Sequence, residues 1–115
     1  MATLVTYREG STMARVIIAD DHPLFRAALT ETLSAPILEA ESFEQLLALI
    51  DSHPHVELVL LDLTMPGNRG LTGLTSLRSR YPDILVVVVS ANEQLATIRQ
   101  AMAFGASAYI PKSMP

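Results

Sequence analysis

Four short apolar runs recur along the chain, and longer segments with helical spacing separate them. The runs cover residues 16–19, 58–61, 84–89 and 108–111, and a weaker run at 37–40 predicts an edge strand. Between the runs, apolar residues recur at intervals of three and four, as in Phe43, Leu46 and Ile50. Strands that alternate with such helices are typical of βαβ units and a parallel sheet. The pattern therefore predicts one α/β domain with five strands and four helices.

Several residues predict where the helices begin and end. Ser42 and Gln45 form a capping-box pattern before the second helix. Asn92 is predicted to cap the fourth helix, and Gly105 is suited to its C-terminal stop.

Each of the four strong runs ends in a polar side chain that is suited to handling a phosphoryl group. These residues are Asp20 and Asp21, Asp62, Ser90, and Lys112. The carboxyl ends of parallel strands gather at one edge of a sheet, which is where ligands bind in such folds. Three carboxylates, a hydroxyl and an ammonium group would then converge there, a set that suits Mg²⁺-assisted phosphoryl transfer.

Each of these residues also has an ordinary structural explanation when it is considered alone. The aspartates could cap a helix or end a buried strand, the serine could cap a helix, and the lysine could lie on the surface. Only the combination favours a functional site. We interpret His22 as a partly exposed residue of the first helical turn, and His53 and His55 as residues of a solvated loop.

Composition narrows the class of protein. The 115 residues carry a net charge of −4, which argues against a nucleic-acid surface in this chain. The absence of cysteine excludes disulfides and thiolate chemistry. The longest of the apolar runs has six residues, well short of the roughly 20 that cross a bilayer. We therefore expect a cytoplasmic protein without a membrane partner.

Taken together, these motifs resemble the receiver domain of bacterial response regulators, and in particular the NarL/LuxR/FixJ subfamily. The matching segments are IIADDHPLFR at 17–26, LVLLDLTMPG at 58–67, VVVVSA at 86–91 and FGASAYIPKS at 104–113. The resemblance implies a flavodoxin-like, doubly wound sheet of five parallel strands in the order 2-1-3-4-5.

The resemblance also implies a role for each site residue. Asp62 would accept a phosphoryl group from a sensor histidine kinase, in a protein that catalyses only its own phosphorylation and dephosphorylation. The implied Mg²⁺ ligands are the side chains of Asp20, Asp21 and Asp62 and the backbone carbonyl of Thr64. Ser90 and Lys112 would contact the phosphoryl group, and Tyr109 would turn inward when Ser90 moves toward it.

The resemblance covers residues 15–115, and we interpret residues 1–14 as an N-terminal extension. We expect no counterpart to the family's fifth helix or to a DNA-binding output domain, because the sequence has three residues after Lys112. DNA would be contacted only through such an output domain. One face of the sheet should then be poorly covered, which favours a homodimer or a less stable fold.

Two other functions compete with the phosphorylated switch. A protein-interaction module could keep the fold without using phosphate, although the complete set of site residues disfavours it. A phosphohydrolase would normally need a second aspartate two residues after the first, where this chain has Thr64.

Overall fold

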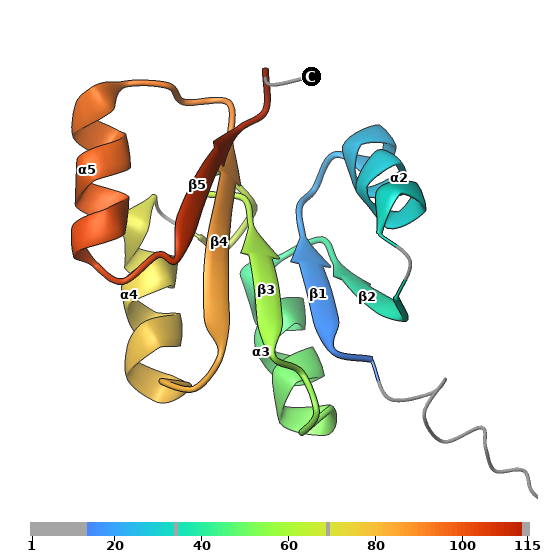
Figure 1. Cartoon of the computed structure of the whole chain (residues 1–115). Coiled ribbons are helices and arrows are strands. Elements are labelled where there is room, and N and C mark those ends of the chain that lie inside the picture. The colour runs from blue at the N-terminus through green and yellow to red at the C-terminus, as the bar shows by residue number, and fades with distance from the viewer. Residues whose placement is uncertain (1–13, 34, 69, 114–115) are drawn as a thin grey trace, which may run out of the picture.

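The computed structural model describes residues 14–33, 35–68 and 70–113, which form a five-stranded sheet with helices on both faces (Figure 1). All neighbouring strands are parallel, and their order is β2-β1-β3-β4-β5. The strands are β1 (Val16–Ala19), β2 (Ile37–Ala40), β3 (Leu58–Leu61), β4 (Leu85–Ser90) and β5 (Ala108–Pro111). The predicted fold class and strand order are confirmed.

The two faces of the sheet are covered unequally. Three helices pack on one face, whereas α2 packs on the other face among the described residues (Figure 1). The helices are α2 (Pro23–Thr32), α3 (Phe43–Ser52), α4 (Leu71–Arg80) and α5 (Leu95–Ala103). The larger core lies beneath α3, α4 and α5.

Continuous apolar runs occur because both faces of the central strands are buried. In β3, Val59 and Leu61 point into the larger core, whereas Leu60 points toward α2. Alternate residues of β4 divide in the same way, with Val88 on one side and Val89 on the other. A strand whose side chains are buried on both faces needs apolar residues at every position.

Two expected boundaries change in the structure. The strand expected at 84–89 runs from Leu85 to Ser90, so Ser90 belongs to the strand instead of following it. Gln94, not Asn92, is the N-cap of α5. The Asn92 side chain instead accepts a hydrogen bond from the Gln94 amide at 2.8 Å, which is the local turn contact that asparagine favours. The Ser42 cap is confirmed, because its Oγ accepts from the Gln45 amide at 3.1 Å.

The expected N-terminal extension lies almost entirely outside the described residues and stays a prediction. Ala14, the last residue of that range, is buried.

No described helix is long and apolar enough to span a bilayer.

An apolar hollow of about 520 Å³ lies between α2 and the strands beneath it. Its apolar walls include Phe25, Leu29, Leu60, Val89 and Ile110. Ile110 is 43% exposed even though it belongs to a strand. Apolar surface of this kind tends to associate when it is contiguous and open to water.

We expect the 115-residue chain to bind a hydrophobic dye such as anilinonaphthalene sulfonate and to self-associate with rising concentration. Ile110→Ser should lower both signals, because it removes an apolar wall of the hollow. Leu95→Ser, at a leucine on α5 that is 58% exposed, is the control and should change neither. Fluorescence titration and sedimentation equilibrium measure the two effects. A strictly monomeric chain that binds no dye would contradict this expectation.

Candidate functional site

Backbone hydrogen bonds between neighbouring strands align the ends of the strands. The Asp20 amide donates to the Ala40 carbonyl at 3.0 Å, and the Asp62 amide donates to the Ala19 carbonyl at 2.9 Å. On the other side, the Lys112 amide donates to the Ser90 carbonyl at 2.8 Å. The carboxyl edge of the sheet therefore gathers the predicted residues at one place.

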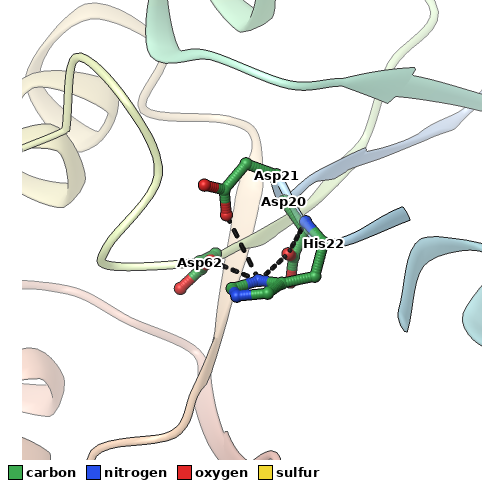
Figure 2. A group of neighbouring side chains, drawn as sticks. All are labelled: Asp20, Asp21, His22 and Asp62. Atoms are coloured by element: carbon green, nitrogen blue, oxygen red, sulfur yellow. Dashed lines mark hydrogen bonds and ion pairs between the residues drawn. The ribbon is translucent and has the colours of Figure 1, made fainter. Parts of the chain in front are cut away.

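The acidic residues form a compact group at this edge. Asp20 and Asp62 are buried, with 2% and 1% of their surface exposed, whereas Asp21 is exposed. One ligand atom from each of Asp20, Asp21, His22 and Asp62 lies within 4.8 Å of all the others. Figure 2 shows the three carboxylates turned toward the His22 ring. The predicted acidic cluster is therefore present as a spatial group.

The two carboxylate oxygens of Asp62 have different environments. Oδ1 accepts hydrogen bonds from the Thr64 amide at 3.1 Å and from the Thr64 hydroxyl at 3.0 Å. Oδ2 instead faces the Lys112 ammonium at 3.4 Å. Thr64 thus fixes the rotation of the carboxylate and directs Oδ2 toward the positive charge.

Lys112 is held by groups at the end of β1 and on α2. Its Nζ lies 2.8 Å from Asp20 Oδ2 and 4.7 Å from the centre of the Phe25 ring. Only 14% of its side chain is exposed. Partial burial reduces screening by water, so this ammonium interacts strongly with the two buried carboxylates beside it.

Ser90 and Tyr109 meet at the loop that follows β4. Ser90 is fully buried, and its Oγ accepts a hydrogen bond from the Asn92 amide at 3.1 Å. The Tyr109 hydroxyl donates to the Asn92 carbonyl at 2.5 Å. Ser90 also shares a cavity of about 520 Å³ with Thr64. The structure therefore connects Ser90 to the Asp62 loop on one side and to Tyr109 on the other.

His22 has a more central place than the sequence suggested. It is the N-cap of α2, before the first helical turn, and 59% of its side chain is exposed. Its amide donates to Asp20 Oδ1 at 2.8 Å, which holds the residue over the acids. The side chain is partly exposed, as expected, but the residue precedes the first turn and its Nδ1 lies within 3.6 Å of three carboxylates. Its position directly after two aspartates was the available signal.

Arg26 is a second residue that the sequence analysis missed. This buried side chain donates from Nη1 to the Asp20 carbonyl at 2.6 Å and from Nε to Glu39 at 2.8 Å. A buried guanidinium needs such partners to offset its desolvation. Arg26 therefore fixes the backbone on which Asp20 is mounted.

Asn68 is the third missed residue, and it lies on the loop after Asp62. Its Nδ2 donates to the Asp62 carbonyl at 2.9 Å, and its Oδ1 accepts from the Gly73 amide at 3.1 Å. A Cβ on Gly73 would lie 2.2 Å from that Oδ1. Asn68 therefore ties the Asp62 loop to α4, and this contact requires glycine at position 73.

Gly73→Ala should destabilise the fold by about 1–3 kcal/mol, even though alanine favours an exposed helix interior by about 1 kcal/mol. The physical reason is the clash with the buried Asn68 amide, with a smaller contribution from Phe43 Cε1, which would lie 2.9 Å from the added Cβ. Urea denaturation measures the loss, and Ser79→Ala, on the exposed side of α4, should stay within about 0.5 kcal/mol of the parent.

A double-mutant cycle isolates the clash. Gly73→Ala should cost less in an Asn68→Ala background than in the parent, since the obstructing amide is then absent. Equal costs in both backgrounds would show that the strain has another origin.

The donor set fits a hard divalent cation. Carboxylate oxygens are the preferred ligands of Mg²⁺, and two of the three carboxylates here are buried at one edge. Adjacent ligands of an octahedral ion with bonds of about 2.1 Å lie about 3 Å apart, which requires a compact group such as this one.

Comparisons with known proteins agree with the fold. A profile described as "Response regulator receiver domain" matches residues 16–115. The "Glycerol metabolism activator" of Pseudomonas putida is 41% identical over 108 residues, which cover 90% of this chain and 49% of that protein. The first three curated relatives are covered over 31% to 49% of their length, so the chain spans at most about half of each.

Solved structures show the same architecture. The receiver domain of NarL from Mycobacterium tuberculosis is 33% identical, with a TM-score of 0.76 over 89% of this chain and 86% of that one. A CheX–CheY–BeF₃–Mg²⁺ complex from Borrelia burgdorferi contains a chain that is 25% identical, with a TM-score of 0.75 over 87% of this chain and 78% of that one. The family match over nearly the whole described chain agrees with the resemblance noted from the motifs, and this chain belongs to the response regulator receiver domain family.

Proposed function

We propose that this chain is a phosphorylation-controlled switch that accepts a phosphoryl group on Asp62 from a phosphohistidine of a sensor histidine kinase. The observation that carries the proposal is the buried Asp62 carboxylate, whose Oδ2 faces the Lys112 ammonium at 3.4 Å among further acids. Family membership supports the same role.

Asp62 Oδ2 is the nucleophile in this proposal. It attacks the phosphorus atom of the donor while the phosphorus–nitrogen bond breaks, and the electron pair of that bond leaves with the imidazole. The product is an acyl phosphate on Asp62. Thr64 supports the attack because its two hydrogen bonds occupy Oδ1 and leave Oδ2 toward the incoming group.

Lys112 and Ser90 bind the transferred group. The Lys112 ammonium pairs with a phosphoryl oxygen. The backbone amide of Lys112 donates to the Ser90 carbonyl at the end of β4, and this hydrogen bond keeps the side chain opposite Asp62. The Ser90 hydroxyl donates to a second phosphoryl oxygen after it leaves its contact with the Asn92 amide. That movement would free space for Tyr109, whose hydroxyl is bonded to the same loop.

Asp20, Asp21 and Asp62 would hold Mg²⁺, with the backbone carbonyl of Thr64 as a further ligand. A bound Mg²⁺ neutralises the charge that builds up when a phosphoryl group enters a group of carboxylates. The Borrelia relative, whose complex contains Mg²⁺ and BeF₃, supports this assignment.

In this proposal, the domain that the switch controls lies outside this chain. Among the curated relatives, which are about twice as long or longer, are transcriptional regulatory proteins and activators. We therefore propose that the phosphorylated domain controls a DNA-binding domain, and that the hollow beside α2 supports a homodimer. The chain catalyses its own phosphorylation and dephosphorylation, and no other reaction.

Incubation with acetyl phosphate and Mg²⁺, followed by Phos-tag electrophoresis, tests the proposal. We expect a slower band that disappears in hydroxylamine, which cleaves acyl phosphates. A chain that stays unmodified while remaining folded would instead favour a protein-interaction module that does not use phosphate.

A further inference from the structure

We propose that His22 is a nitrogen ligand of the cation site, and that it gives this site a higher affinity for transition metals than three carboxylates would. The inference rests on the proposed cation site and assigns one more residue to it. His22 Nδ1 lies 2.8 Å from Asp20 Oδ1, 3.2 Å from Asp21 Oδ1 and 3.6 Å from Asp62 Oδ2 (Figure 2).

These distances match those between neighbouring ligands of one ion. Adjacent ligands of an octahedral ion with bonds of about 2.1 Å are about 3 Å apart. The three contacts of Nδ1 lie on either side of that value. All four ligand atoms also fall within 4.8 Å of one another, so a single ion can reach each of them.

The surroundings of Nδ1 favour a lone pair shared with a cation. The Lys112 ammonium lies 3.0 Å from Nδ1, 2.8 Å from Asp20 Oδ2 and 3.4 Å from Asp62 Oδ2. These atoms therefore already surround a positive charge in the structure. An ion bound by Nδ1 and the carboxylates would take the place of this ammonium, which would have to turn away as the ion binds.

The position of His22 is fixed by the chain. The hydrogen bond from its backbone amide to Asp20 Oδ1, together with the start of α2 at Pro23, holds the residue beside the site. Its side chain is 59% exposed, so an ion from solvent can reach it. Imidazole is a good ligand for Ni²⁺, Co²⁺ and Zn²⁺, whereas Mg²⁺ prefers oxygen. Loss of the ring should therefore weaken the binding of Ni²⁺ far more than that of Mg²⁺.

Isothermal titration of untagged protein with NiCl₂ and with MgCl₂ tests the inference. In His22→Ala we expect the Ni²⁺ dissociation constant to rise at least about tenfold, and that of Mg²⁺ to change less than about threefold. His22→Asn, which offers an oxygen in place of the nitrogen, should keep Mg²⁺ binding and lose the Ni²⁺ preference. The visible spectrum of bound Co²⁺ should change in both variants, because a nitrogen ligand is lost.

His55→Ala is the matched control, since this exposed histidine lies in the loop before β3, at the other end of that strand from Asp62. It should change neither constant. Equal Ni²⁺ affinity in the parent and His22→Ala, or tighter binding of both ions in that variant, would overturn the role of His22. If the parent protein binds Ni²⁺ through His22 but does not bind Mg²⁺, the Mg²⁺ part of the proposed function is contradicted. The assignment of His22 as a metal ligand is then still supported.

Discussion

Asp62→Asn should abolish labelling by acetyl phosphate and Mg²⁺, with no slower band in Phos-tag electrophoresis and no acyl phosphate in the intact mass. The physical reason is that the amide lacks the anionic Oδ2, which is the oxygen that faces Lys112 in the parent. The side chain has nearly the same shape, so the fold should be kept. Borohydride trapping in the parent should convert Asp62, and no other aspartate, to homoserine.

Asp83→Asn is the matched control for this loss, because Asp83 is an exposed acid in the loop before β4 and lies away from the site. It should be labelled like the parent. Lys112→Ala should be labelled slowly although Asp62 is intact, since the phosphoryl oxygens lose their cationic partner. Labelling that survives Asp62→Asn, or that maps to His22, would rule out Asp62 as the acceptor.

Mg²⁺ should raise the melting temperature of the parent by a saturable amount. A ligand that binds only the folded state at 100 times its dissociation constant stabilises that state by about 2.7 kcal/mol. For a domain of about 100 residues, 1 kcal/mol corresponds to roughly 4–8 °C, so the shift should be easy to measure. The source of the gain is the relief of repulsion among the clustered carboxylates.

The variants assign that gain to particular carboxylates. Asp20→Asn should remove most of the Mg²⁺ response, because it deletes a buried ligand oxygen. Without metal, Asp62→Asn should melt at a higher temperature than the parent, because one of the repelling charges is gone. The Mg²⁺ response of each variant is measured from its own metal-free melting temperature, since Asp20 also pairs with Lys112 at 2.8 Å. Differential scanning fluorimetry with NaCl of equal ionic strength as the control measures both effects. A melting temperature that ignores millimolar Mg²⁺ would contradict the cation site.

Local sequence patterns determined most of the architecture. Apolar runs such as 58–61 fill both faces of the sheet at every position, so they could be identified as buried parallel strands without a structure. Parallel strands bring their carboxyl ends to one edge of the sheet, so the polar residues at the ends of these runs could be expected to lie together. This is why Asp20, Asp62 and Lys112 could be assigned to one site in advance, and the structure places them together.

Only the tertiary structure decided how the site is supported. The contacts of His22, Arg26 and Asn68 with the site were not foreseen, because a one-dimensional pattern does not contain them. The His22 backbone amide donates to Asp20 Oδ1, and its ring Nδ1 lies 2.8 Å from the same oxygen at the start of α2. Asn68 reaches both the Asp62 carbonyl and the Gly73 amide because the loop and α4 approach closely at a residue without a side chain. Strand and helix periodicity fixes which face a residue occupies, whereas side-chain hydrogen bonds between loops depend on distances that only packing determines.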